Sequence, residues 1–281
     1  MSDDYRVAGV MGWPVAHSRS PAMHRYWLER HGLAGDYVKL AVPPKNLARA
    51  LRALPDLGFA GCNLTIPHKE AALDLVDAVD DQARAIGAVN TIIVRPHGML
   101  QGFNSDAFGF IENLKAEAPQ WRAAAGPAVV LGAGGAARAV VAALLDHGVD
   151  ELRLVNRHRE RAEQLASAYD GRVRVWDWEQ RAAALAGGRL LVNTTSLGMH
   201  GTAPLDLPLA DLPADAVVND IVYTPLETPL LAAARKRGNP TVDGIGMLLH
   251  QGRPGFAGWF GIRPEVTPEL RARVIATLGP A

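Results

Sequence analysis

The sequence has little cysteine, no net charge and no long apolar run. Cys62 is the only cysteine among the 281 residues, which excludes an intramolecular disulfide and favours a reducing compartment such as the cytoplasm. The 29 Lys and Arg residues balance the 29 Asp and Glu residues, so no global positive field would attract nucleic acid. No apolar run approaches the roughly 18 residues of a membrane-spanning helix. We therefore expect a cytoplasmic protein that has neither nucleic acid nor a membrane as a partner.

The start of the chain also lacks the features of a secretory signal, because residues 1–6 contain neither a basic segment nor an apolar core. Hydrophobic residues are abundant, by contrast: they make up 48% of the sequence and can form a sizeable core. A length of 281 residues accommodates one large domain or two of ordinary size. This composition is typical of a soluble globular protein.

Short apolar runs alternate with helical patterns in the first half of the chain. Strands are predicted over 6–12, 37–42, 61–66, 89–94 and 99–103, and helices over 21–31, 47–54, 68–79 and 106–116. Ser20 is placed to cap the helix that begins at Pro21. The turn Pro96-His97-Gly98 joins the last two strands into a hairpin.

From residue 128 the pattern becomes a regular alternation of strand and helix. Strands are predicted over 128–131, 151–156, 172–177, 189–194 and 216–222, and helices over 135–147, 160–169 and 228–237. A helix through His250-Gln251 and a terminal helix over 268–278 have no following strand, so we expect them to pack back on the N-terminal half. The alternation predicts an α/β fold with a parallel sheet.

A glycine-rich loop follows the predicted strand 128–131 and opens the next helix. Its residues are Gly132, Ala133, Gly134, Gly135 and Ala136. In the pattern Gly-x-Gly-x-x-Ala, the first glycine permits a tight turn and the second lets the backbone approach a pyrophosphate. The helix N-terminus supplies free N–H groups and a partial positive charge. The loop therefore predicts a dinucleotide site, and the alternative is a glycine-rich connection that binds nothing.

The end of the next strand indicates which dinucleotide binds. An NAD enzyme carries an acidic residue there, which accepts a hydrogen bond from the ribose 2′-hydroxyl. This chain has Asn156-Arg157-His158 instead, and Arg161 follows one turn later. The guanidinium groups of Arg157 and Arg161 suit a 2′-phosphate, so NADP is the predicted cofactor. The alternative is that these arginines only solvate a loop.

Polar side chains also collect at the ends of predicted strands in the first half. Ser18 and Ser20 follow the first strand; with Ser20 as the helix cap, the hydroxyl group of Ser18 is left over and suits a small oxyanion. Lys69 follows the third strand, and Asp106 follows the hairpin. A Lys that is held by an Asp can serve a developing alkoxide as acid and as positive charge. Taken one at a time, Lys69 and Asp106 are ordinary surface charges, so their pairing is a hypothesis.

Nine segments in the same order make the chain resemble the shikimate dehydrogenase family, a family of NADP-dependent oxidoreductases. The matching segments are His17–Pro21, Asn63–Lys69, Gly87–Thr91, Gly102–Asp106, Gly132–Ala136, Asn156–Arg157, Asn193–Thr195, Asp220–Tyr223 and Asp243–Leu248. The resemblance implies an N-terminal α/β substrate domain, a Rossmann-like NADP-binding domain and C-terminal helices that return to the first domain. The substrate domain would comprise residues 1–105 and 244–281, and the NADP domain residues 106–243.

The resemblance also implies a reaction and the residues that perform it. The reaction is the reversible NADPH-dependent reduction of 3-dehydroshikimate to shikimate, a step toward chorismate and the aromatic amino acids. Lys69 would be the catalytic acid–base and Asp106 its partner, and both would touch the substrate. The other implied substrate ligands are Ser18, Ser20, Thr65, Asn90, Tyr223 and Gln251. Asp81, Ile221 and Gly244 would join the residues of the two nucleotide loops at the cofactor.

Three positions depart from the family pattern. His158 stands where the nucleotide loop more often has Thr, which changes the side chain that is offered to the 2′-phosphate. Trp13 and His68 replace the more usual Asn and Phe, and we expect them to shape the wall of the substrate pocket. His68 is also a rival for the role of acid, because it precedes Lys69 directly.

Two other functions remain open at this point. One is a quinate and shikimate dehydrogenase that accepts both acids or uses NAD. The other is a non-catalytic dinucleotide-binding regulator, against which the intact pair Lys69 and Asp106 argues. No metal is expected, because the histidines lack the spacing of metal ligands. A monomer and a homodimer are both compatible with the sequence.

Overall fold

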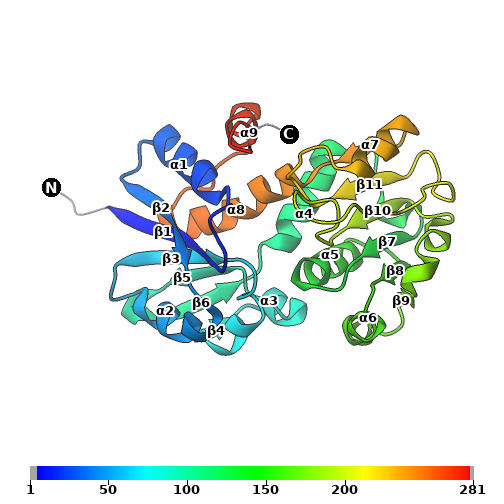
Figure 1. The fold of residues 1–281 in the computed structure, drawn as a ribbon. Helices are drawn as coiled ribbons and strands as arrows, with labels where there is room; N and C mark the ends of the chain where they lie inside the picture. Colours follow the sequence, from blue (N-terminus) through cyan, green and yellow to red (C-terminus); the bar gives the residue numbers. More distant parts are fainter. Residues whose placement is uncertain (1–4, 279–281) are drawn as a thin grey trace. The chain divides into compact units, whose positions relative to one another are not determined.

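The computed structural model describes residues 5–278 and divides into two compact α/β units (Figure 1). One unit comprises the described residues up to Asp106 and from Leu248 onward, and the other comprises Ala107–Met247. Helices α4 (Asp106–Glu117) and α8 (Gly244–Phe260) carry the chain from one unit to the other. Residues 1–4, on which the predicted absence of a secretory signal rests, lie outside the described residues, as do residues 279–281.

The sheet of the first unit mixes parallel and antiparallel strands. Its order is β2-β1-β3-β5-β6-β4, and the members are β1 (Arg6–Gly12), β2 (Gly35–Ala41), β3 (Phe59–Leu64), β4 (Ala78–Val79), β5 (Thr91–Val94) and β6 (Leu100–Phe103). β1 is parallel to β2 and β3, whereas β5 is antiparallel to β3 and to β6. Val94 pairs with Leu100 across the turn, so the predicted hairpin is confirmed.

Helices cover this first sheet and return to it from the C-terminus. They are α1 (Ser20–His31), α2 (Leu47–Ala53), α3 (Asp81–Ile86), the second part of α8, and α9 (Pro268–Ile275). Helix α9 lies beside α1 (Figure 1), and Tyr26 of α1 donates to a carboxylate oxygen of Glu269 in α9 at 2.9 Å. Trp259 of α8 donates to the carbonyl oxygen of Ile92 at 2.9 Å. The predicted return of the C-terminal helices is therefore confirmed.

Two local predictions in this unit are wrong. The segment 68–79 is not a helix: it forms a 3₁₀ turn over Ala71–Asp74 and then the edge strand β4. Asp77 fixes this path, because its N–H donates to Leu100 O at 2.9 Å and its carboxylate accepts from Leu100 N at 2.7 Å. Ser20 does not cap α1; it is the first helical residue, and Arg19 holds the cap position without a side-chain hydrogen bond.

The second unit contains one parallel sheet with the order of a dinucleotide-binding fold. The order is β12-β11-β10-β7-β8-β9, with β7 (Ala128–Leu131), β8 (Leu152–Val155), β9 (Val173–Trp176), β10 (Leu190–Asn193), β11 (Val217–Asp220) and β12 (Thr241–Val242). Counted from β7, this is the Rossmann order 3-2-1-4-5-6. The helices are α5 (Gly135–Asp146), α6 (Arg159–Ala166) and α7 (Pro229–Lys236), with the first part of α8 and most of α4. The predicted Rossmann-like fold is confirmed.

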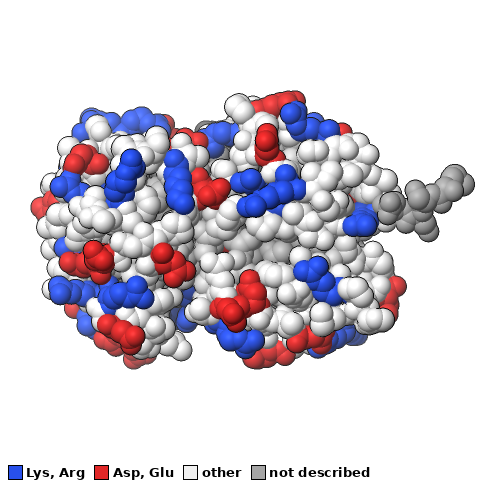
Figure 2. Space-filling model, turned by 180° about the vertical axis from the view of Figure 1, so that it is seen from behind, with Lys and Arg blue, Asp and Glu red and all other residues white. Residues whose placement is uncertain are grey.

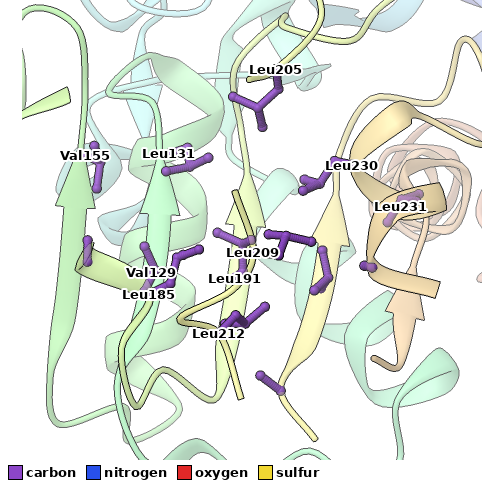
Figure 3. Close-up of a cluster of buried hydrophobic side chains, with 14 residues drawn as sticks. Val129, Leu131, Val155, Leu185, Leu191, Leu205, Leu209, Leu212, Leu230 and Leu231 are labelled. Carbon is purple, nitrogen blue, oxygen red and sulfur yellow. The ribbon is translucent and has the colours of Figure 1, made fainter. Parts of the chain in front are cut away.

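The core of this unit lies where the strands meet side chains from the loop before β11 (Figure 3). Leu131 and Leu191 are fully buried on β7 and β10, and Leu209 and Leu212 cover them from that loop. Burying one such leucine contributes about 1.5–3 kcal/mol relative to exposure. The strands are buried because a parallel sheet is covered on both faces, which explains their continuous apolar sequences.

Candidate active site

Lys69 and Asp106 form an ion pair in the first unit. Lys69 follows β3 after a short turn, and its carbonyl oxygen accepts from Val89 N at 2.8 Å. Asp106 is the first residue of α4. The ammonium nitrogen of Lys69 lies 2.5 Å from Oδ2 of Asp106, and the two side chains are 20% and 8% exposed. The structure thus brings the two predicted catalytic residues into direct contact and shields them from most of the solvent.

Three further contacts hold Asp106 in place beside Lys69. The amide nitrogen Nδ2 of Asn90 donates to the other carboxylate oxygen of Asp106 at 2.8 Å. The backbone N–H of Asp106 donates to Oδ1 of Asn104 at 2.9 Å, and Asn104 in turn donates to Ala88 O at 2.9 Å. Both oxygens of the carboxylate therefore have a partner, and hydrogen bonds to an ionised carboxylate are among the stronger ones in proteins.

The predicted substrate ligands of the first unit lie at the ends of neighbouring strands. Gln251 of α8 accepts from Nδ2 of Asn90 at 3.4 Å, which places it beside the ion pair. Ser18 donates to Ser20 at 3.3 Å between their hydroxyl oxygens, so these two groups lie next to each other. Thr65 is half-buried directly after β3, and its N–H donates to Met11 O at 3.0 Å. These positions offer hydroxyl and amide groups, which suit a carboxylate and several hydroxyls.

His68 does not compete with Lys69 for the role of acid. Its Nε2 lies 2.8 Å from the carbonyl oxygen of Val42, and its side chain is buried. Burial lowers the pKa of His68, so the ring is neutral at physiological pH. The imidazole of His68 is therefore fixed against the end of β2.

Trp13, the other departure from the family pattern, is half-exposed and donates its backbone N–H to Ile66 O at 3.1 Å.

The glycine-rich loop of the second unit has the shape that a pyrophosphate requires. Gly132 has φ of +109°, and a Cβ there would lie 2.6 Å from Oγ1 of Thr194. A Cβ at Gly134 or Gly135 would meet open space, so the backbone is accessible from outside. Gly134 holds the cap position of α5 and has no side chain to satisfy the first N–H groups. The residues present therefore fit a phosphate group at the start of α5.

The loop after β8 exposes cations, as expected for a 2′-phosphate. Arg157, His158 and Arg161 are all exposed, and Nδ2 of Asn156 donates to His158 O at 2.8 Å. Arg159 is bound to Glu163 at 2.7 Å and to Asp177 at 2.6 Å. Among the residues that the structure describes, neither Arg157 nor Arg161 forms an ion pair. Arg157 in the loop and Arg161 in α6 are thus available to an anion, whereas the charge of Arg159 is neutralised.

The remaining predicted site residues are three cofactor contacts and one substrate ligand, Tyr223, and they are distributed over both units. Gly244, at the start of α8, packs so closely on the backbone of Ile221 that a Cβ would collide with its carbonyl group. Tyr223 lies two residues beyond Ile221 and is half-buried. Asp81 belongs to the first unit and is exposed in the first turn of α3. Its approach to the cofactor stays a prediction.

A buried carboxylate supports the loops at this end of the second sheet. Asp220, the last residue of β11, accepts from Asn193 Nδ2 at 3.0 Å, from Val222 N at 3.0 Å and from Thr228 Oγ1 at 2.7 Å. It thereby connects the ends of β10 and β11 with the start of α7. Asp220 is fully buried, and burial raises its pKa from 3.8 to about 6.

The raised pKa predicts that Asp220 makes stability depend on pH. The folded protein binds the proton more tightly than the unfolded chain, so the stabilisation is complete below pH 3.8 and is lost as pH rises through about 6. The loss amounts to about 3 kcal/mol, because each pH unit between the two pKa values corresponds to about 1.4 kcal/mol. Asp220→Asn should remove this dependence. Urea unfolding from pH 4 to pH 7 measures it, with the exposed Asp211→Asn as control. Equal pH slopes for wild type and Asp220→Asn would contradict the assignment.

Two other kinds of feature were searched for in the part of the chain that the structure describes. Residues 5–278 contain no group of three or more His, Cys, Asp and Glu side chains that could hold a metal ion. No helix within this range combines the length and apolar character that crossing a bilayer requires. On the face that Figure 2 shows, basic and acidic side chains of the described residues are interspersed.

Two family models match successive parts of this chain. The model of the shikimate dehydrogenase substrate binding domain matches residues 10–92, and the shikimate/quinate 5-dehydrogenase model matches residues 115–197. The shikimate dehydrogenase (NADP(+)) of Paramagnetospirillum magneticum is 60% identical over 276 residues, which cover 98% of this chain and 100% of that protein.

Two solved structures are similar along nearly their whole length. Shikimate 5-dehydrogenase of Thermus thermophilus, in complex with NADP(H) and shikimate, has a TM-score of 0.86 at 39% identity and covers 97% of this chain and 99% of its own. Quinate dehydrogenase of Corynebacterium glutamicum, in complex with NAD, has a TM-score of 0.90 at 33% identity and covers 98% and 100%. With two family models matched in order and a relative that is 60% identical, the chain belongs to the shikimate dehydrogenase family.

Proposed function

We propose that this enzyme catalyses the reversible NADPH-dependent reduction of 3-dehydroshikimate to shikimate, on the route to chorismate and the aromatic amino acids. The observation that carries the proposal is the shielded ion pair of Lys69 and Asp106, with Asn90 and Gln251 beside it. A relative that is 60% identical bears the name shikimate dehydrogenase (NADP(+)), and a similar solved structure holds NADP(H) and shikimate.

The ion pair explains how this chain would complete the reduction. NADPH supplies the hydride when it is bound. As the carbonyl carbon accepts the hydride, negative charge develops on the carbonyl oxygen, and the ammonium group of Lys69 stabilises this charge and donates a proton to it. Asp106 keeps the ammonium group in place through the 2.5 Å contact. In the reverse direction, neutral Lys69 accepts the proton of the substrate hydroxyl.

The other polar groups of the first unit would bind and orient the substrate. We assign the substrate carboxylate to the adjacent hydroxyls of Ser18 and Ser20, with Tyr223 near it. Thr65, Asn90 and Gln251 would bond the ring hydroxyls. A substrate with one carboxylate and several hydroxyls uses every one of these groups, and leaves none of them facing an apolar surface.

In the second unit we assign the pyrophosphate to the backbone of the loop Gly132–Ala136, where no side chain caps the start of α5. The 2′-phosphate would bind beside Asn156, Arg157, His158 and Arg161. Ile221 and Gly244 would border the nicotinamide, and Asp81 would approach the cofactor. The absence of a carboxylate directly after β8 supports NADP over NAD.

Three further assignments are proposals of the same kind. We place the substrate domain at residues 1–105 with 244–281, and the NADP domain at residues 106–243. We also place the enzyme in the cytoplasm, because a single cysteine suits a reducing compartment. That cysteine, Cys62, is a small buried core residue, and burial raises its pKa to about 12. A monomer or a homodimer is expected, and sedimentation at several concentrations distinguishes the two.

A steady-state assay of shikimate and quinate, each with NADP and with NAD, tests the function. We expect the highest kcat/KM for shikimate with NADP, since a 2′-phosphate held by two arginines is worth at least about tenfold over NAD. Quinate with NAD as the better pair would instead assign the chain to quinate oxidation, as in the C. glutamicum relative. Tight NADPH binding without any turnover would indicate a regulator.

A further inference from the structure

The side-chain amide of Asn90 has donors on one side and acceptors on the other. Its oxygen Oδ1 accepts from Thr91 Oγ1 at 2.8 Å, from Ser105 N at 2.9 Å and from Ser105 Oγ at 3.1 Å. Its nitrogen Nδ2 donates to Asp106 Oδ1 at 2.8 Å and to Gln251 Oε1 at 3.4 Å. Asn90, Thr91, Ser105 and Asp106 are all at most 5% exposed. Water therefore has little access to the amide, and its orientation depends on these neighbours.

We propose that Thr91 and Ser105 are positioning residues that hold the Asn90 amide in the one orientation in which its NH₂ group can bind Asp106. The inference rests on the proposed function, because it concerns the same ion pair. A flipped amide would place Oδ1 against the Asp106 carboxylate and NH₂ against the N–H of Ser105. Both contacts would be repulsive, and neither the carboxylate nor the backbone N–H can reverse its role.

The hydroxyl of Thr91 is itself directed toward Asn90. Nδ2 of Asn63 donates to Thr91 Oγ1 at 3.0 Å, so the oxygen is engaged as an acceptor and its proton can turn to Asn90. Tyr37 fixes Asn63 in turn, because its hydroxyl donates to Asn63 Oδ1 at 2.7 Å. Thr91 also pairs with Asn63 on β3 and with Phe103 on β6. The sheet therefore holds the donor rigidly.

The amide of Asn90 matters for the reaction because the two carboxylate oxygens of Asp106 have different partners. Asn90 occupies Oδ1, which leaves Oδ2 for the ammonium group of Lys69 at 2.5 Å. Without the amide, the carboxylate can rotate about its last side-chain bond, and Lys69 can follow it. A displacement of the acid by about 1 Å can lower turnover by roughly 100-fold. Thr91 and Ser105 thus act on the reaction through Asn90 and Asp106, without touching the substrate themselves.

Thr91→Val tests the proposal, because it keeps the shape of the side chain and removes the hydroxyl. We expect kcat for 3-dehydroshikimate reduction to fall about 10- to 100-fold, while the KM for NADPH stays within about twofold, since a misplaced acid affects the transition state rather than cofactor binding. Thr91→Ser restores the hydroxyl and should recover kcat to within about threefold of wild type. Ser105→Ala should lower kcat in the same sense, and it replaces Thr91→Val if that variant does not fold.

The matched control is Thr267→Val, the same substitution at the cap of α9, where Thr267 Oγ1 accepts from Leu270 N at 3.2 Å. It should lower Tm and leave kcat unchanged. A folded Thr91→Val with wild-type kcat, or Thr91→Ser with the same loss as Thr91→Val, would overturn the proposal.

Hydrogen exchange of the Asn90 NH₂ group, followed by NMR with ¹⁵N-labelled asparagine, gives a readout that does not need activity. It should be slow in wild type and at least about tenfold faster in Thr91→Val, because a buried bonded group exchanges only when it opens. If wild type has no turnover, the proposed function fails, and the exchange rates still decide the role of Thr91. Equal exchange rates in the two proteins would contradict that role.

Discussion

Lys69→Ala is expected to lower kcat for the reduction of 3-dehydroshikimate by about 10²–10⁴-fold, the usual cost of losing a positioned acid. The ammonium group of Lys69 is 2.5 Å from Asp106 and largely shielded from water, and Asp106 has no second ion pair among the described residues. His68 cannot substitute, since its ring is held at Val42 O and burial lowers its pKa. The carbonyl oxygen would then develop its charge beside an unpaired carboxylate.

Steady-state kinetics and NADPH titration by fluorescence together check this prediction. The dinucleotide loop belongs to the other unit, so the Kd for NADPH should stay within about threefold of wild type, as expected when only a transition-state interaction is removed. Lys45→Ala is the matched control, because Lys45 is an exposed lysine of the same unit. A folded Lys69→Ala enzyme with near wild-type turnover would remove Lys69 from the mechanism.

The parallel sheet of the second unit could be predicted almost strand by strand from the sequence. Its strands are buried on both faces, so they appear as short continuous apolar runs such as Ala128–Leu131. Glycines mark the turns between the elements, and Gly148 at φ +89° follows α5 as expected for a helix end. Local sequence and tertiary environment agree here, which is why the prediction succeeded.

The segment 68–79 shows why the same reasoning failed in the first unit. Leu73 and Val76 have helical spacing, yet both pack on the core of the mixed sheet from a 3₁₀ turn and the residues after it. The decisive contacts are those of Asp77 with Leu100 and Arg52, which are distant in the sequence. Helix α3 is also missing from the prediction, although Asp80 caps it at Ala83 N and Gly87 ends it with φ of +74°. Both signals are present in the sequence, but a helix of 6 residues is too short to show a periodic pattern.

For the candidate site, too, part could be predicted from the sequence and part could not. The pairing of Lys69 with Asp106 was only a hypothesis from their places after predicted strands, and the family resemblance then supported it, since the two residues are 37 positions apart and no spacing rule connects them. The role of Thr91 and Ser105 could not be predicted at all. Their hydroxyl groups meet at 3.2 Å only because β5 and β6 pair in one particular register, and register is a property of the folded sheet.

A second substitution with a large expected effect lies in the loop after β8 and concerns the preference for NADPH over NADH. Arg157→Ala should reduce kcat/KM for NADPH about 10- to 100-fold, because a charge-assisted hydrogen bond to a phosphate is lost. The value for NADH should change less than about threefold, since NADH has no 2′-phosphate to lose a contact. The variant is therefore expected to discriminate less between the two cofactors, and mainly through KM.

Arg159→Ala is the control for this prediction, because Arg159 lies two residues away at the start of α6 and is already bound to Glu163 and Asp177. If general positive charge attracts NADPH, both substitutions should weaken it equally, and the effect should fade in high salt. If a specific contact is made, Arg157→Ala should cost far more than Arg159→Ala at every salt concentration. An Arg157→Ala enzyme that keeps the wild-type ratio of kcat/KM for NADPH and NADH would move the 2′-phosphate to Arg161 or His158, whose side chains are also exposed.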